Sequence, residues 1–138
     1  KTSASGEGLI MNELLDFYRN ITFFEEYDEN SFIGRWLDYS EWNDKEYWKL
    51  EKDLLKIAQM YRTTNEVFPD ILIGVMRIIE LLMIPNWNSF IISNSESVDI
   101  YDRYERFKYI ISILFNNKDV RLDGFSYTEK NDDVFYNE

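Results

Sequence analysis

The chain has 138 residues, of which 45% are hydrophobic, so it is long and apolar enough for one folded domain rather than a disordered segment. It contains no Cys and no His, which excludes disulfides, thiolate nucleophiles, imidazole bases and metal sites built on these ligands. The net charge of −11 disfavours nucleic acid and anionic membranes as partners and favours a cationic protein.

Only 5 Gly and 2 Pro are present, too few for the turns of a β-sandwich or barrel. The sequence therefore predicts a mainly α fold, a compact bundle of roughly four to five helices around a buried central helix, with a small C-terminal β-hairpin as an optional addition. Residues 1–8 are small and polar, and we expect a linker or a disordered terminus there. Residues 9–138 are expected to form a single helical domain.

Residues 9–20 have the apolar spacing of an amphipathic helix. The segment after it ends in EEYDEN, which places carboxylates around one tyrosine: Glu25, Glu26, Tyr27, Asp28 and Glu29. We expect a solvated loop there, followed by a helix N-cap at Asn30 or Ser31.

Residues 31–39 are rich in aromatic side chains and predict a short helix. Gly34 would weaken this helix or allow another backbone to approach it closely. The inward face of the helix would consist of Phe32, Ile33, Trp36 and Leu37.

A longer helix follows, with an N-cap at Asn43 or Asp44 and an end at residues 63–65. Its apolar residues have helical spacing and predict a core face. Its lysines alternate with Glu46, Glu51 and Asp53, which predicts a solvated face with pairs of opposite charge three and four residues apart.

Residues 69–84 are apolar except for Asp70 and three residues spaced three apart, Gly74, Arg77 and Glu80. These three would share one narrow stripe of a helix, where Arg77 and Glu80 can pair. A helix that is apolar on almost every side is a buried one, and this run is too short and too charged to cross a membrane. The segment is therefore predicted to be the buried central helix.

Residues 86–99 read as a connector, and its middle, residues 90–93, is left open between a turn of helix and a short strand. Residues 100–117 have strong amphipathic spacing and predict a helix capped by Asp99. The Asp123–Gly124 pair lies between the alternating runs VRL and FSY, which predicts a β-hairpin.

The surplus negative charge lies in the irregular segments, because residues 1–43 hold nine acids against three bases while residues 44–62 are nearly balanced. Carboxylates interleaved with aromatic side chains on loops suit the inhibitor of a basic protein. No catalytic, phosphate-binding or calcium-binding motif is present, so we expect no enzyme activity, no cofactor and no small-molecule substrate. The candidate contact residues are Glu25, Glu26, Tyr27, Asp28, Glu29, Asp38, Tyr39, Glu41, Trp42, Asp132 and Asp133.

In the stretch SFIGRWLDYSEWNDKEYWKLEKDL, residues 31–54, and in its size, acidity and helical pattern, the chain resembles immunity proteins of bacterial polymorphic-toxin and contact-dependent growth inhibition systems. Within these it is most similar to the immunity protein 41 family. The resemblance implies a cytoplasmic, non-enzymatic protein that neutralises the C-terminal toxin domain of a surface-exported effector. Toxins of this kind are often RNases, including EndoU-like enzymes, with cationic RNA-binding clefts. The resemblance transfers no contact residues.

Two other functions fit the sequence. An acidic mimic of nucleic acid would space its carboxylates along one face like phosphates. A helical adaptor without an inhibitory role would expose a large apolar patch in place of an acidic one.

Overall fold

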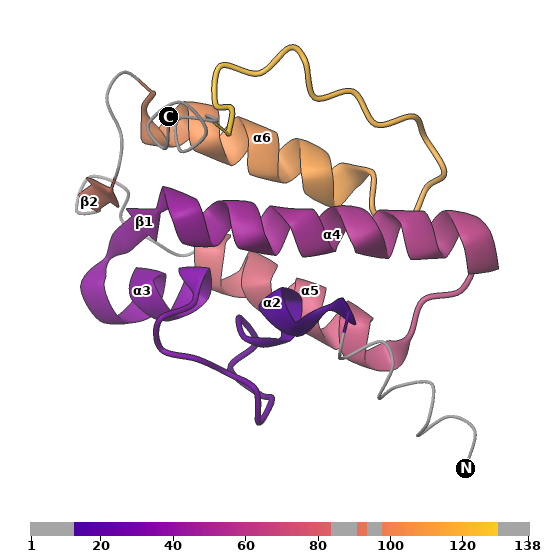
Figure 1. Cartoon of the computed structure of the whole chain (residues 1–138), viewed down its shortest axis with the longest axis horizontal. Coiled ribbons are helices and arrows are strands. Elements are labelled where there is room, and N and C mark those ends of the chain that lie inside the picture. Colours follow the sequence, from indigo (N-terminus) through magenta and orange to yellow (C-terminus); the bar gives the residue numbers. More distant parts are fainter. Residues whose placement is uncertain (1–12, 84–90, 94–97, 130–138) are drawn as a thin grey trace, which may run out of the picture.

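The structure is a computed structural model and describes residues 13–83, 91–93 and 98–129. It confirms the mainly α fold (Figure 1). In chain order its elements are α2 (Leu15–Tyr18), α3 (Phe32–Tyr39), β1 (Glu41–Asn43), α4 (Asp44–Thr64), α5 (Pro69–Met83), β2 (Ile91–Ser93) and α6 (Ile100–Ser112). Among these described residues no helix is long and apolar enough to cross a membrane.

The centre of the molecule is α4, which lies between α6 on one side and α2 and α3 on the other (Figure 1). Its start agrees with the prediction, because the side chain of Asn43 accepts a hydrogen bond from the backbone N–H of Glu46 at 3.0 Å. Its side chains reach the core on both sides of the bundle. Those that are buried and apolar are Tyr47, Leu50, Leu54, Ile57 and Ala58.

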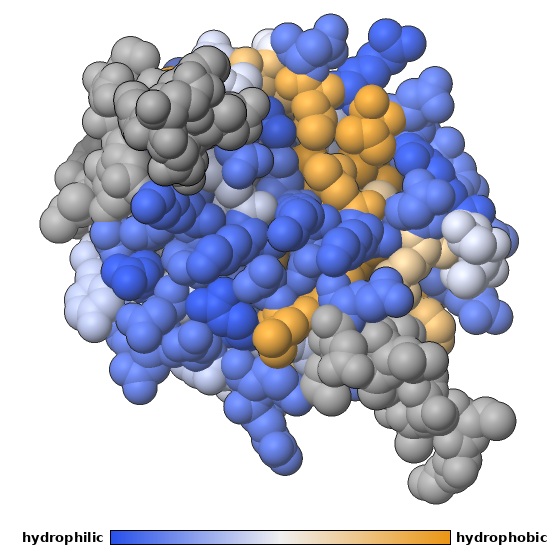
Figure 2. All heavy atoms as spheres, in the orientation of Figure 1, coloured by the Kyte–Doolittle hydropathy of each residue, from blue (hydrophilic) through white to orange (hydrophobic). Residues whose placement is uncertain are grey.

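The outer face of α4 is hydrophilic (Figure 2) and carries the exposed Lys45, Lys49, Lys52 and Lys56. The prediction of a solvated face therefore holds for the lysines. It is wrong for Glu51 and Asp53, which are 4% and 2% exposed. Each of these two carboxylates has a partner on another helix, which explains how a buried charge is tolerated.

The prediction that residues 69–84 form a buried central helix is wrong in its placement. α5 lies at the edge of the bundle and buries only one side, with Ile71, Val75, Ile78 and Leu82. Its other side exposes three large apolar residues: Leu72 at 44%, Ile73 at 45% and Met76 at 59%. The exposed side also carries Glu80, whereas the buried side is wholly apolar, but the large apolar residues on both sides hid this difference.

Two residues of the stripe on α5, Gly74 and Arg77, lie towards α2 and the segment that follows it. A Cβ atom at Gly74 would come within 2.7 Å of the Phe17 ring, so glycine allows the two helices to approach closely. Arg77 pairs with Glu80 at 2.9 Å, as the spacing predicts, and also donates to the Thr22 hydroxyl at 2.8 Å.

A short parallel pairing joins the two halves of the chain. Trp42 of β1 is in register with Ile92 of β2, so the connector forms a strand at residues 91–93. Next, α6 begins at its predicted cap, where the Asp99 side chain accepts from the N–H of Asp102 at 2.9 Å. It ends at Ser112, five residues before the predicted end.

The predicted C-terminal hairpin is wrong. Residues 123 and 124 form a turn, but the described residues on either side of it, 120–129, contain no strand. The segment is held to the helices instead. The Tyr127 hydroxyl donates to Asp44 at 2.7 Å, and Arg106 donates to the backbone carbonyl of Tyr127 at 2.9 Å.

Two buried ion pairs join α4 to α6. Arg103 donates twice to Asp44, at 3.1 Å each, and Arg106 donates to both oxygens of Glu51 at 2.8 and 2.9 Å. The sequence did not predict these pairs, because both helices read as solvated amphipathic helices with balanced charge. Together with the Tyr127 contacts they fix the packing of α4, α6 and the C-terminal segment.

Candidate functional site

The candidate site is a shallow, open depression on the surface formed by the loop before α3 and by the last residue of α3. We call residues 25–30 the acidic loop. Its side chains form one wall, and the 57% exposed ring of Tyr39 forms part of the rim. The residues that line the depression are Glu26, Tyr27, Asp28, Glu29, Asn30 and Tyr39.

Tyr27 lies among negative charges in this depression. Its burial raises the pKa of its phenol, and the carboxylates of Asp38, Glu29 and Asp28 raise it further. Tyr27 therefore stays neutral and keeps its O–H as a hydrogen-bond donor. Asp38 belongs to α3, so this helix and the acidic loop both contribute negative charge that raises the pKa of Tyr27.

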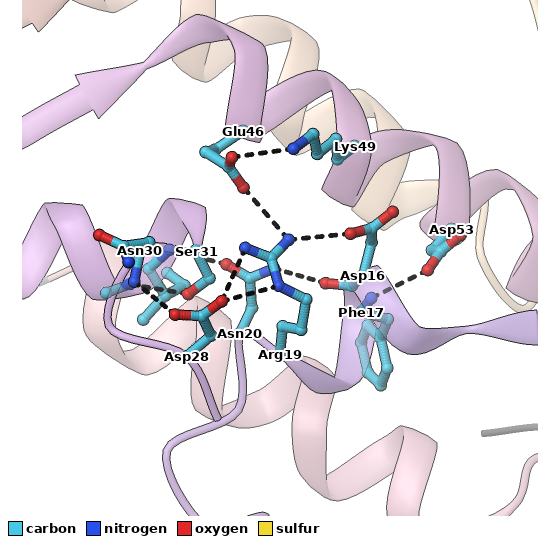
Figure 3. Close-up of polar contacts among 12 residues, drawn as sticks. Asp16, Phe17, Arg19, Asn20, Asp28, Asn30, Ser31, Glu46, Lys49 and Asp53 are labelled. Carbon is cyan, nitrogen blue, oxygen red and sulfur yellow. Dashed lines mark hydrogen bonds and ion pairs between the residues drawn. The ribbon is translucent and has the colours of Figure 1, made fainter. Parts of the chain in front are cut away.

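Arg19 anchors the acidic loop (Figure 3). Its guanidinium donates to Asp28 of the loop at 3.1 and 3.2 Å, to Asp16 of α2 at 2.8 Å and to Glu46 of α4 at 3.2 Å. The Arg19 side chain is only 16% exposed. One side chain therefore ties the loop to two helices.

Asp28 is also fixed through its backbone. Its N–H donates to the carbonyl of Arg19 at 2.9 Å, and its carbonyl accepts from Ser31 at 3.0 Å. Its carboxylate accepts from the N–H of Asn30 at 2.8 Å, and this bond, together with Arg19, lowers the pKa of Asp28. Asp28 is thus an ionised structural residue of the loop.

Gly34 lies directly beneath the acidic loop. A Cβ atom at this position would lie 2.3 Å from the carbonyl oxygen of Glu29 and 2.6 Å from that of Asp28. Of the two roles predicted for Gly34, close approach of another backbone is the one that the structure supports. Ser31 caps the same helix, and its hydroxyl accepts from the N–H of Gly34 at 3.0 Å.

The other carboxylates among the candidate contact residues differ in whether they have a cationic partner within the chain. Glu41 pairs with Arg35 at 3.1 Å, so its charge is already matched within the chain. Within the described part of the chain, no cation lies at ion-pair distance from the others, which are Glu25, Glu26, Glu29 and Asp38. These four carboxylates are available to an external cationic group.

Trp42 requires a correction. It is 0% exposed, so its side chain is removed from the set of contact residues. As the middle residue of β1 it points into the core, where its ring packs edge-on against Phe32 and its indole N–H donates to Tyr127 at 3.0 Å. Asp132 and Asp133 lie outside the described residues.

Sequence reasoning identified the acidic loop but missed the residues that position it. Arg19 read as one polar residue of an amphipathic helix, and its spacing of three from Asp16 was the only available signal. Asn20 gave no signal. It is 1% exposed, and its side chain accepts from the N–H of Ile33 at 2.7 Å while donating to the carbonyl of Asp16 at 2.6 Å, which fastens α2 to α3.

The groups that line this site can make ion pairs, hydrogen bonds and aromatic contacts. It offers unpaired carboxylates, a neutral phenol and an exposed aromatic ring. In the part of the chain that the structure describes, no group of three or more Asp or Glu side chains is placed to hold a metal ion.

Comparison with known proteins places the chain in a family. A family model described as "Immunity protein 41" matches residues 19–126, which is most of the chain and includes the acidic loop, α4 and α6. No curated protein and no solved structure shows significant similarity to the chain.

Proposed function

The chain belongs to the immunity protein 41 family, and from this premise we propose that it binds and neutralises the C-terminal toxin domain of a contact-dependent growth inhibition effector. The proposed partner is a nuclease domain, with EndoU-like RNases as the first class to test. Such an enzyme holds phosphates with Lys and Arg and therefore presents a cationic cleft. The proposed place of action is the cytoplasm of the producing cell or its siblings, and the proposed mechanism involves no catalysis by this chain.

The observation that carries the proposal is the gathering of unpaired carboxylates around two tyrosines. Glu26, Glu29 and Asp38 supply charge without an internal partner, so pairing them with a toxin cation breaks no ion pair of this protein. Tyr27 and Tyr39 supply aromatic surface with a polar tip, the combination that is enriched at the centres of protein interfaces.

The charges and the tyrosines are expected to affect different steps. Long-range attraction between the acidic site and a basic cleft speeds association and weakens as salt is added. Burial of the aromatic rings slows dissociation. A toxin with a lethal activity must be captured quickly and then held, and this division of roles meets both needs.

The alternatives differ in what they require of the surface. A nucleic-acid mimic needs carboxylates spaced like phosphates, whereas these are clustered around Tyr27 and Tyr39. An adaptor needs an apolar docking face, and the exposed Leu72, Ile73 and Met76 of α5 are the observation that favours it. We therefore retain the adaptor as the second candidate.

The test is binding to the toxin domain encoded by the open reading frame immediately upstream, measured at low and physiological salt. The site variant E26Q/E29Q/D38N should lower the association rate about tenfold at low salt and flatten its salt dependence. Y27A and Y39A should instead raise the dissociation rate, by about thirtyfold for a residue at the centre of the interface.

The matched control is E66Q/D119N/D123N, which removes three exposed carboxylates far from the site and gives the same net charge. It should behave like the wild-type chain. An equal loss of association rate in both triple variants would mean that only the net charge of the chain matters, and not the position of the carboxylates. Failure of the wild-type chain to silence the toxin at one-to-one stoichiometry would refute the proposed function.

A further inference from the structure

We propose that Arg19 is a positioning residue that preorganises the acidic loop for its partner, an inference that rests on the function proposed above. The residue belongs to the framework of the site and need not touch the toxin. Its guanidinium lies between the loop and the two helices and connects the loop to α2 and α4 (Figure 3). Its effect on binding would therefore act through Asp28.

The geometry requires an arginine. Three carboxylates converge on the guanidinium from three segments of the chain: Asp16 at 2.8 Å, Asp28 at 3.1 Å and Glu46 at 3.2 Å. A planar guanidinium has five N–H donors in a fixed arrangement and can serve all three at once. A lysine ammonium carries the same charge on a flexible stem and does not reproduce that arrangement.

Electrostatics make the same residue necessary. Without Arg19, Asp16 and Asp28 would lose their cation and Glu46 would keep only Lys49, at 3.1 Å, beside the unpaired Glu26 and Glu29. Repulsion would then drive the acidic loop away from α2 and α4. Arg19 therefore allows one surface to hold a high density of negative charge in a fixed shape.

The order of the loop matters for affinity because Tyr27 and Glu29 are the two chain neighbours of Asp28. Asp28 is held through its carboxylate and through its N–H, which donates to the Arg19 carbonyl at 2.9 Å. Because both the side chain and the backbone of Asp28 are held, the side chains of Tyr27 and Glu29 are held in fixed directions. A loop that is already ordered loses less conformational entropy on binding, and the gain appears mainly in a slower dissociation.

The experiment compares R19Q and R19K with R62Q, which removes an exposed arginine at the opposite end of α4. Two quantities are measured below the melting temperature of every variant. One is hydrogen exchange of the Asn30 amide, which donates to Asp28, in the isolated chain. The other is the pair of association and dissociation rates with the upstream-encoded toxin domain.

R19Q should speed exchange at Asn30 and raise the dissociation rate about tenfold without lowering the association rate, because it leaves the site more negative. R19K should not restore either quantity, since it returns the charge without the planar geometry. R62Q should match the wild-type chain in both. This pattern is not that of general destabilisation, which lowers the fraction of active protein and leaves the dissociation rate unchanged.

Each opposite result overturns the inference. Full restoration by R19K would mean that charge alone is sufficient. Faster exchange in R19Q with an unchanged dissociation rate would mean that loop order does not contribute to binding, while the proposed function would stand. If the wild-type chain binds no toxin domain, the proposed function fails and this inference fails with it.

Discussion

The Glu51 carboxylate accepts two hydrogen bonds from the Arg106 guanidinium, at 2.8 and 2.9 Å, with both side chains less than a tenth exposed. This pair connects α4 to α6 inside the bundle. Tyr47 donates to the same carboxylate at 2.9 Å, and Arg106 also donates to the carbonyl of Tyr127. Every charged group in this network has a hydrogen-bond partner. We therefore expect a loss of stability only when one member is removed and its partner is left buried without a counter-charge.

Substitution of either member alone should be severe. E51M or R106M should each lower the free energy of unfolding by about 3–5 kcal/mol, because the remaining charge is buried without its counter-charge. The double variant E51M/R106M should lose less than the sum of the two single losses, as measured by urea denaturation. Strict additivity would show that the pair carries no coupling energy.

Gly34 and Gly124 give a matched pair of alanine substitutions. G34A should destabilise the fold by about 1–3 kcal/mol, because the new Cβ atom would collide with the carbonyl of Glu29. It should also weaken toxin binding, since the collision displaces the acidic loop. G124A meets no atom within 4 Å and should change stability by about 0.5 kcal/mol or less. Thermal unfolding and toxin titration test both, and equal effects of the two would contradict the packing role of Gly34.

The pH dependence of stability should differ in sign between Asp28 and Asp53. The pKa of Asp28 is lowered by the Asn30 N–H and by Arg19, so its ionised form stabilises the fold above its unfolded pKa, and this contribution is lost as the pH falls through the lower folded pKa. The pKa of Asp53 is raised by burial, so its contribution is present at low pH and is lost as the pH rises through the folded pKa.

The measurement is urea denaturation of D28N and D53N between pH 3 and 7. Relative to the wild-type chain, D28N should become less stable as the pH rises, and D53N should become more stable. The Phe17 N–H, which donates to Asp53 at 2.9 Å, retains an acceptor in D53N. Parallel curves for the two variants would contradict the assignment.

The apolar side of α5 separates the two candidate functions. L72S/I73S/M76S should leave toxin neutralisation within about twofold of the wild-type level, and each exposed substitution should change stability by about 0.5 kcal/mol or less. Loss of neutralisation in this variant, with full activity in E26Q/E29Q/D38N, would reverse the assignment and place the partner on α5. A pull-down from the source cells with both variants gives the same distinction for an adaptor.

Local signals in the sequence were enough for most of the elements. The caps at Ser31, Asn43 and Asp99 each have a side chain that accepts a backbone hydrogen bond near the start of the predicted helix. These contacts span only a few residues, so the pattern that specifies them is visible in one sequence. The acidic loop was found for the same reason, because its carboxylates and its tyrosine are neighbours in the chain.

Contacts between distant segments were not predictable in this way. Which helix is central depends on how whole helix faces pack. The run that forms α5 is more apolar than α4, yet α4 occupies the centre. The pairing of Glu51 with Arg106 joins residues 55 apart, and that of Arg19 with Glu46 joins residues 27 apart. Neither spacing repeats a helical or strand period, so no local pattern identifies the partners.

The carboxylates of the acidic loop have two different roles, and this difference affects how the sequence of the protein can evolve. Asp28 is tied into the framework, whereas Glu25, Glu26 and Glu29 make no ion pair within the described chain. On the proposed function, substitutions at these three positions are expected to alter which toxin is recognised while the bundle keeps its stability. The helical bundle can thus stay unchanged while the specificity for a partner diverges. The same three positions are where an engineered change of specificity should begin.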